Sequence, residues 1–257
     1  MEFKDKVALI TGGTSEIGFA VAAKLAEKGA KIVIVGRNIE KGQQALAELK
    51  QIDTNVEFLS ADVSKSEQVK NIVYYAQDRF GGLDLAFNNA ANDEITPAPT
   101  HEFSEEDYDR LMAVTLKGVW LCMKYELQIM YKQKRGVIVN TSSVDALLCS
   151  AGTAVYSAGK SGVIAISKSI AQEYGKDGIR VNTVSPGAIR TPLLEKKFHN
   201  LSKEEALFLE TKYQGINALG KVGSPSEAAD VVMWLLSDQS SYVTGQNIIA
   251  DGGICFM

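Results

Sequence analysis

Short apolar runs alternate with segments of helical periodicity along the whole chain, and this alternation limits the folds that it can adopt. The strand-like runs are rich in apolar and β-branched residues: KVALIT (6–11), KIVIVG (31–36), NVEFLS (55–60), LDLAFN (83–88), GVIVNT (136–141), IRVNTVS (179–185) and QNIIAD (246–251). Helical segments separate them. Strands and helices that alternate in this way form a parallel sheet covered by helices on both faces. We therefore predict an α/β, doubly wound, seven-stranded parallel sheet.

Periodicity and capping residues mark the helices. After the first strand, Ile17, Val21 and Leu25 recur at helical spacing. Other capping patterns predict where three further helices start: Ser64 with Glu67 for a helix to about Phe80, Ser104 for a long helix to Tyr131, and Ser224 with Pro225 and Glu227 for a last helix to Leu236. Two more helices are expected at 40–50 and 152–171.

Length and composition are consistent with one domain. The 257 residues include 46% hydrophobic residues, which is enough for one core, so we expect residues 1–257 to form a single domain. The net charge is −4, with Lys and Arg scattered among acids, which disfavours nucleic acid and anionic membranes as partners.

Neither a signal sequence nor a membrane span is expected, and we predict a cytoplasmic protein. The apolar run near the N-terminus is too short for a signal sequence. Cys122, Cys149 and Cys255 are odd in number and widely spaced, which is typical of reduced thiols. No metal-ligand pattern surrounds His101 or His199, so no metal site is predicted.

A hydroxyl, a phenol and an ammonium at 143–160 are the main candidates for chemistry. Tyr156 and Lys160 are four residues apart, so a helix would place both side chains on one face. Ser143 follows the strand-like run GVIVNT, and ligands of open α/β sheets bind at the carboxyl ends of strands. Alone, the Tyr-x-x-x-Lys spacing occurs by chance in many helices.

The magnitudes favour a proton-transfer site. A free tyrosine has a pKa near 10, so about one phenol in a thousand is ionised at neutral pH. An ammonium about 4 Å away contributes roughly 4 kcal/mol at an effective dielectric constant of about 20, which lowers the pKa by about three units before desolvation. Such a phenol can pass a proton to or from an alcohol or carbonyl oxygen that a serine hydroxyl also binds.

The motifs together resemble the short-chain dehydrogenase/reductase family over the whole chain. They occur in the family's order: TGGTSEIG (11–18), Asp62 in ADV, NNA (88–90), Ser143, YSAGK (156–160), PGAIRT (186–191) and a TGQ…DGG tail. This resemblance implies a Rossmann-type fold, a dinucleotide cofactor and a Ser143–Tyr156–Lys160 catalytic site.

The resemblance also implies a set of cofactor-binding residues. Gly12 and Gly18 should let backbone amides and a helix N-terminus face a pyrophosphate, Asp62 should bind the adenine edge, and Lys160 should bind the nicotinamide ribose. The full expected set is Gly12, Thr14, Ser15, Ile17, Gly18, Arg37, Asn38, Asp62, Val63, Asn89, Ala90, Tyr156, Lys160, Pro186, Gly187, Ile189 and Thr191.

The end of the second strand indicates which cofactor is preferred. Gly36 and Arg37 stand there, whereas NAD-binding chains carry an acid for the ribose 2′-hydroxyl. An arginine suits a 2′-phosphate, so NADP is favoured and NAD stays possible. Ser15, where many NADP-dependent members have a basic residue, argues in the other direction.

Two residues depart from the family pattern in ways that bear on activity. Glu16 replaces a usual glycine and puts a carboxylate near the expected pyrophosphate, unless it points to solvent. Thr115 replaces an asparagine that, in the family, helps hold a water linking the active-site lysine to solvent. Its hydroxyl could do part of this, or could simply bond its own backbone.

Two segments near the C-terminus indicate a substrate lid and an interface. The polar, charged stretch at about 190–222, with a possible short helix at Ser202 and Glu205, is expected to form a lid. The terminal ICFM is apolar and follows the last strand. By resemblance to the family, this tail and the two long helices form interfaces of a homotetramer.

We therefore expect an NADP(H)-dependent oxidoreductase that interconverts a small-molecule ketone or aldehyde and an alcohol. Within enzymes, the alternative is a 3-oxoacyl-carrier-protein reductase, which the long 191–220 segment and the acidic surface make less suitable. The alternative from another class is a non-catalytic dinucleotide-sensing protein. Glu16 and Thr115 favour it, and the complete Ser143, Tyr156 and Lys160 set disfavours it.

Overall fold

Seven parallel strands form one sheet, which confirms the predicted doubly wound α/β fold. The structure is a computed structural model that describes residues 3–91, 97–190, 204, 211 and 215–256. The strands are β1 (Val7–Thr11), β2 (Lys31–Gly36), β3 (Val56–Ser60), β4 (Leu85–Asn88), β5 (Gly136–Thr141), β6 (Ile179–Pro186) and β7 (Asn247–Ala250). Their order across the sheet is β3-β2-β1-β4-β5-β6-β7, so the chain winds outwards in both directions from β1 and β4.

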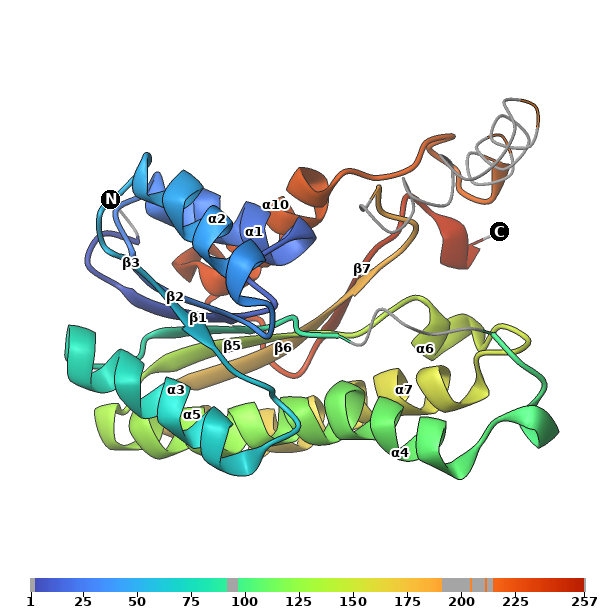
Figure 1. Ribbon diagram of the computed structural model, residues 1–257, viewed down its shortest axis with the longest axis horizontal. Coiled ribbons are helices and arrows are strands. Elements are labelled where there is room, and N and C mark those ends of the chain that lie inside the picture. The colour runs from blue at the N-terminus through green and yellow to red at the C-terminus, as the bar shows by residue number, and fades with distance from the viewer. Residues whose placement is uncertain (1–2, 92–96, 191–203, 205–210, 212–214, 257) are drawn as a thin grey trace.

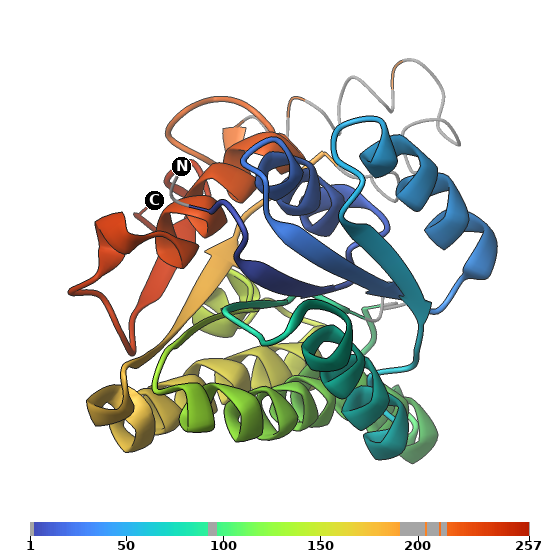
Figure 2. The ribbon, with the colours of Figure 1, turned by 90° about the vertical axis from the view of Figure 1, so that its left-hand side faces the viewer.

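Helices cover both faces of the sheet, as Figures 1 and 2 show. One face packs against α1 (Glu16–Ala26), α2 (Ile39–Lys50) and α10 (Pro225–Leu236), and the other against α3 (Ser66–Phe80), α5 (Val119–Gln133) and α7 (Ala154–Tyr174). Each face has its own buried apolar cluster, because the central strands carry apolar residues on both sides. This single domain therefore has two hydrophobic layers that hold the strand ends in place.

Shorter elements complete the described chain. They are α4 (Glu105–Met112), α6 (Asp145–Leu148) and the 3₁₀ segments η1 (Thr100–Glu102), η3 (Gly175–Asp177), η4 (Asp238–Ser240) and η5 (Ile254–Phe256). Ser104 caps α4 as predicted, since its hydroxyl accepts a hydrogen bond from the Asp107 amide at 3.0 Å. The single long helix expected after it is interrupted by a π-helical segment, η2 (Ala113–Gly118), which joins α4 to α5.

The capping box predicted at Ser64 and Glu67 is wrong. Instead, the Asp62 carboxylate accepts a hydrogen bond from the Ser64 amide at 2.9 Å. The Lys65 amide also donates to the Asp62 carbonyl at 3.0 Å, which closes a turn. Helix α3 therefore begins later, at Ser66, without a side-chain cap.

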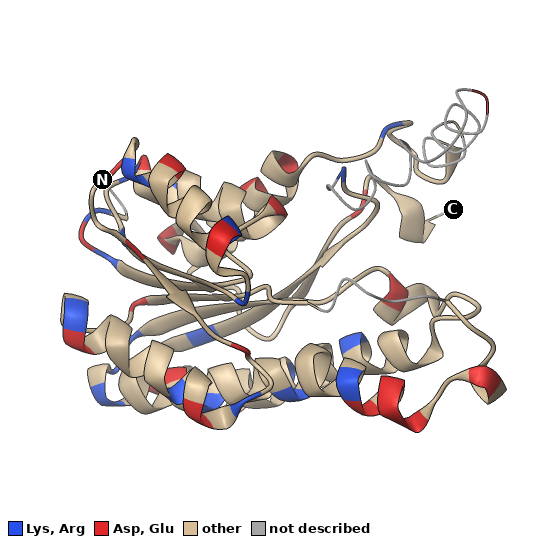
Figure 3. Cartoon of the chain, viewed as in Figure 1, with Lys and Arg blue, Asp and Glu red and all other residues tan. Residues whose placement is uncertain are grey.

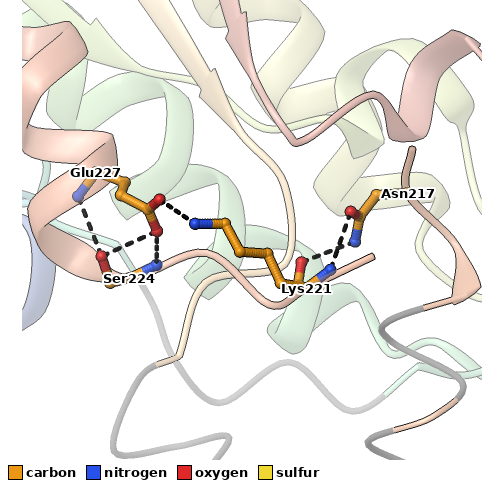
Figure 4. A network of polar contacts seen from close by, with 4 residues as sticks. All are labelled: Asn217, Lys221, Ser224 and Glu227. Carbon is orange, nitrogen blue, oxygen red and sulfur yellow. Dashed lines mark hydrogen bonds and ion pairs between the residues drawn. The ribbon is translucent and has the colours of Figure 1, made fainter. Parts of the chain in front are cut away.

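The predicted capping box of α10 is confirmed, and it extends into the preceding loop (Figure 4). Ser224 Oγ accepts from the Glu227 amide at 3.2 Å, and Glu227 Oε2 accepts from the Ser224 amide at 2.9 Å. Lys221 Nζ contacts the other Glu227 oxygen, and these contacts lower the pKa of Glu227 to about 2. Asn217 in turn donates to the Lys221 carbonyl at 2.9 Å, so the loop is tied to the helix start.

Most of the expected substrate lid at about 190–222, including its possible short helix at Ser202 and Glu205, lies outside the described residues. None of the described helices is both long and apolar enough to pass through a bilayer.

Candidate active site

A cavity of about 620 Å³ opens at the carboxyl ends of the strands. The strand order reverses between the adjacent strands β1 and β4, and in open parallel sheets this is where ligands bind. Almost every residue expected at the site lines this cavity: Gly12, Thr14, Ser15, Ile17, Arg37, Asn38, Asp62, Val63, Asn89, Ala90, Ser143, Tyr156, Lys160, Pro186, Gly187 and Ile189. Gly18 and Thr115 are not part of the lining, and Thr191 lies outside the described residues.

Two glycines shape the start of the cavity. Gly12 has φ +65°, and a Cβ there would lie 3.0 Å from Ala90 Cα. A Cβ on Gly18 would lie 2.1 Å from the Gly12 carbonyl oxygen, so only glycine lets α1 pack this closely on the turn. The resulting concave backbone, with the N-terminus of α1 beside it, fits a pyrophosphate.

Two cations lie together at the β2 end of the cavity. Arg37 follows β2, and Lys41 stands in the first turn of α2, whose N-cap Asn38 accepts from the Lys41 amide at 2.9 Å. Within the described residues neither side chain forms an ion pair, so both charges are available to an anionic ligand. Sequence reasoning missed Lys41, although its spacing of four residues from Arg37 and its position after Asn38 could have indicated it.

Thr11 and Asn89 fix the centre of the site. Thr11 Oγ1, at the end of β1, accepts from the amides of Asn89 (3.1 Å) and Ala90 (3.2 Å), which follow β4. Asn89 Oδ1 accepts from Thr141 Oγ1 at 3.0 Å, at the end of β5. These bonds join three neighbouring strand ends, so the floor of the cavity is rigid.

Helix α7 brings Tyr156 and Lys160 to the cavity on one face, as their spacing predicted. Lys160 Nζ is 5.8 Å from the centroid of the Tyr156 ring and donates to the Thr141 carbonyl at 2.8 Å. Only 2% of the lysine is exposed. A lysine is rarely buried to this extent unless a polar group binds its ammonium. Ser142 Oγ also donates to the Lys160 carbonyl at 2.9 Å, which fastens this turn of α7 to the end of β5.

Ser143 lies on the same wall, directly after β5. Its hydroxyl accepts from the Asp145 amide at 3.2 Å, and the side chain is nearly buried. The hydroxyl hydrogen stays available to a ligand oxygen, because this bond uses only a lone pair. A ligand oxygen bound at Ser143 can therefore receive a hydrogen bond from it.

Thr115 lies behind this wall, in the π-helical segment. It is 1% exposed, and its Oγ1 is buried without a hydrogen bond to any described residue. The backbone bond considered as the alternative role of this hydroxyl is thus not formed. A Cβ on Gly159 would lie 3.0 Å from Thr115 Cγ2, which places Thr115 against the turn of α7 that carries Lys160.

The remaining predicted cofactor residues line two further edges. Asp62 holds the turn before α3 through the Ser64 amide. On the opposite edge, the Pro186 carbonyl accepts from the Val144 amide at 3.1 Å, and the Gly187 amide donates to the Ala250 carbonyl at 3.0 Å. The segment after β6 is therefore held against both the Ser143 loop and β7.

Glu16, which stands where the family usually has a glycine, has an unfavourable backbone conformation. It lines the cavity and has φ +56°, a left-handed conformation that glycine adopts freely and glutamate does not. The side chain is half-buried rather than directed fully into solvent. A carboxylate at this position lowers the affinity of the cavity for a phosphate group, although the rest of the cradle is intact.

The described residues contain no group of three His, Cys, Asp or Glu side chains that could hold a metal ion. Cys122, Cys149 and Cys255 are all free thiols.

Comparisons with known proteins show which family this chain resembles. A family model described as Enoyl-(Acyl carrier protein) reductase matches residues 12–255. Cyclohexanol dehydrogenase of Acinetobacter sp. (strain SE19) is 37% identical over 252 residues, which cover 98% of this chain and 95% of that protein. The 3-oxoacyl-[acyl-carrier-protein] reductase FabG of Thermotoga maritima is 37% identical over 255 residues and covers 99% of both chains.

A solved structure extends the likeness to three dimensions. The crystal structure of levodione reductase superimposes with a TM-score of 0.92 at 36% identity and covers 98% of each chain. Sequence, fold and relatives therefore agree that this chain belongs to the short-chain dehydrogenase/reductase family and is an NAD(P)-dependent enzyme acting on CH–OH and C=O groups.

Proposed function

We propose that this protein is an NADP(H)-dependent oxidoreductase that reversibly reduces a small-molecule ketone or aldehyde to an alcohol. The main support is one observation: Ser143, Tyr156 and the buried Lys160 share one wall of a cavity whose other end carries Arg37 and Lys41. A dinucleotide needs such a cavity, with a cradle for phosphates and a polar group beside the reacting carbon.

The three residues have distinct roles in this proposal. The Tyr156 hydroxyl donates a proton to the carbonyl oxygen during reduction and removes it during oxidation. The Lys160 ammonium stabilises the phenolate form of Tyr156, and the Thr141 carbonyl holds this ammonium in place. Ser143 donates a hydrogen bond that orients the substrate oxygen. A nicotinamide bound beside these residues would supply or accept the hydride.

NADP is the proposed cofactor because Arg37 and Lys41, which form no ion pair with a described residue, line the cavity after β2, where the family resemblance implies the 2′-phosphate binds. Guanidinium groups bind phosphate oxygens in a bidentate way, and Lys41 adds a second positive charge. NAD stays possible because the pyrophosphate cradle serves both cofactors. The other residues of the expected cofactor-binding set, from Gly12 to Thr191, are proposed to contact the dinucleotide as the family resemblance implies.

Thr115 is proposed as a positioning residue for a water molecule behind Lys160. Its buried hydroxyl, without a bond to a described residue, favours this role, since a buried hydroxyl is rarely left unsatisfied. One water could accept from the hydroxyl and contact the ammonium, which would give a path for protons.

A homotetramer and a cytoplasmic location complete the proposal. Trp120 and Tyr131 of α5 are 44% and 46% exposed, and they line a surface hollow together with Ile166 and Ile170 of α7. Phe256 in the tail is 86% exposed. Contacts between copies would cover these apolar surfaces, and the mass measured by light scattering tests this. The free thiols favour a reducing compartment.

The substrate lid at about 190–222 stays part of the proposal. The segment leaves β6 at the cavity edge formed by Gly187 and Ile189, and it therefore begins beside the proposed site of reaction.

The second candidate function is 3-oxoacyl-carrier-protein reduction, which the similarity to FabG favours. The charge distribution disfavours it, because an acidic carrier needs a basic docking surface. Figure 3 shows Lys and Arg mixed with Asp and Glu over the outer helices, and the first turn of α4 is acidic. A non-catalytic dinucleotide sensor is the remaining alternative, and the complete catalytic set argues against it.

The Tyr156→Phe variant tests the acid/base role. It keeps the ring and removes the transferable proton, so turnover is expected to fall by about 10²- to 10⁴-fold with NADPH binding nearly unchanged. Tyr242→Phe is the matched control, because Tyr242 is fully exposed. If Tyr156→Phe kept more than about a tenth of the wild-type rate, Tyr156 would not be the proton donor.

The Arg37→Asp variant tests cofactor choice. Losing a charge-assisted contact of about 1.5–3 kcal/mol should raise the NADPH dissociation constant at least about tenfold and leave NADH binding less affected. Lys50→Asp, at the C-terminal end of α2, makes an equal change of net charge and serves as the control. Equal effects of the two variants on NADPH binding would show that Arg37 acts only through overall charge.

Three variants at Thr115 test the water-holding role. Thr115→Ser keeps the hydroxyl and should keep turnover, and Thr115→Asn should hold or raise it. Thr115→Val has a similar shape without the hydroxyl and should lower turnover, most clearly at pH values where proton transfer limits the rate. Identical pH–rate profiles for Thr and Val would remove Thr115 from the mechanism.

A further inference from the structure

A carboxyl group that the proposed mechanism does not use is buried beneath the cavity. Glu126, on α5, is 0% exposed, which is rare for glutamate. Its Oε2 accepts a hydrogen bond from Asn88 Nδ2 at 3.0 Å. Its Oε1 is buried and has no hydrogen bond to any described residue. An ionised carboxylate with one oxygen unpaired would be costly at this position.

Asn88, at the end of β4, has a buried acceptor oxygen that lacks a hydrogen-bond donor among the described residues. Its Nδ2 donates to Glu126 Oε2 and also to Asn140 Oδ1 at 2.9 Å, so both amide hydrogens are used. Its Oδ1 is buried and has no hydrogen bond to a described residue. Rotating the amide by 180° does not help, because it would place Oδ1 against two acceptor oxygens.

One proton satisfies both groups. If Oε1 carries a hydrogen, it becomes a donor, and the unsatisfied Asn88 Oδ1 is an acceptor on the same amide that already binds Oε2. We propose that Glu126 is a neutral carboxylic acid that forms a cyclic pair with the Asn88 side chain, and that this pair positions the strand ends under the dinucleotide cavity.

The pair belongs to a network that reaches the catalytic helix. Asn140, on β5, lies beside Asn88 in the sheet register and donates to Ser167 Oγ of α7 at 2.8 Å. Ser167 Oγ in turn donates to the Val163 carbonyl at 2.7 Å. The network thus connects α5, β4, β5 and α7 beneath the site.

Each asparagine precedes a residue of the cavity floor. Asn88 is followed by Asn89, and Asn140 is followed by Thr141, whose carbonyl holds Lys160. A shift of either strand end would therefore move a cavity residue. Glu126 acts through these residues and is a positioning residue, not a catalytic one.

The surroundings of Glu126 favour the neutral form. Burial raises its pKa from 4.5 to about 8, and the hydrogen bond from Asn88 offsets only part of this. Asn88 and Asn140 face it from the sheet without charge, and α7 contributes the Ser167 hydroxyl through Asn140. Cys122, one turn earlier on α5, has its pKa raised mainly by burial, so this thiol is also neutral.

The other charged or titratable groups nearby have their own partners. The Lys160 ammonium of α7 is bound to the Thr141 carbonyl. On the side of α3, Tyr125 OH contacts Ser66 Oγ at 2.8 Å.

The direction of the pH effect follows from the raised pKa. Unfolded chains release this proton near pH 4.5, and the folded protein releases it near pH 8. The contribution of the proton to stability is therefore full below about pH 4.5, falls as the pH rises to about 8, and is absent above it.

The test compares Glu126→Gln with Glu126→Leu in the full-length protein. A glutamine amide reproduces the neutral acid, because its N–H can donate to Asn88 Oδ1 while its oxygen accepts from Nδ2. Leucine fills a similar volume but leaves the Asn88 amide unsatisfied. We expect Glu126→Gln to bind NADPH with the wild-type dissociation constant, and Glu126→Leu to bind it at least about tenfold more weakly.

The pH dependence of stability separates the protonated pair from a purely structural role of Glu126, which would give no such dependence. Between about pH 4.5 and 8, the unfolding constant of the wild type, divided by that of Glu126→Gln, should rise about tenfold per pH unit. Glu173→Gln, an exposed site on α7, is the control for the change of charge and should show no such slope. Infrared spectra at pH 7 should contain a protonated carboxylic acid band that Glu126→Gln removes.

Three results would overturn the proposal: an unfolding ratio that is flat with pH, no acid band assigned to Glu126, or NADPH binding that Gln impairs as much as Leu. If Glu126→Leu fails to fold, the slope and the infrared band still decide. The effect on the cavity rests on the proposed dinucleotide function, whereas protonation does not. A wild type with the acid band that does not bind NADPH would therefore refute the function and leave the protonated pair in place.

Discussion

The hydrogen bond from the Lys160 ammonium to the Thr141 carbonyl is the interaction on which the proposed site depends. A nearly buried ammonium is unfavourable unless a polar group compensates for lost water, and a backbone carbonyl at the end of β5 provides that compensation. Because the carbonyl belongs to the sheet, the bond fixes α7 relative to the strand ends. Tyr156, one turn earlier on α7, takes its position from the same contact.

The sheet can supply such a carbonyl because its parallel strands end together. Thr11, Asn89 and Thr141 are joined at the ends of β1, β4 and β5, so one edge of the sheet carries both the proposed pyrophosphate cradle and the proposed catalytic wall. Below this edge lies another buried ionisable group, Glu126. The protein stabilises the two groups differently: Lys160 stays next to a carbonyl and the cavity, whereas Glu126 is proposed to be neutralised by its own proton.

Local sequence patterns predicted the strands well, and nearly all the residues expected at the site line one cavity. β2 and β5 have the bounds of their apolar runs, and the α10 capping box has the predicted hydrogen bonds. Patterns of this kind work because neighbouring residues carry the information. The Ser64 cap is absent because the chain forms a turn at Asp62, whose carboxylate accepts from the Ser64 amide, and α3 starts only at Ser66.

Features that depend on distant partners were not visible in the sequence. The π-helical segment interrupts what local periodicity presents as one helix. The role of Glu126 follows only from the folded arrangement, which places it against Asn88, 38 residues away in the chain. An acid within a helical pattern otherwise indicates a solvent-facing position.

Hydride transfer between NADP(H) and a carbonyl carbon is the proposed reaction of this cavity. The most direct measurement is the absorbance of NADPH during incubation of the purified protein with a panel of cyclic and open-chain ketones and aldehydes, with the alcohol product quantified. We expect NADPH to be consumed in an amount equal to the alcohol formed, and faster than NADH. Tight binding of NADPH without consumption, and no reaction of NADP with the matching alcohols, would contradict it.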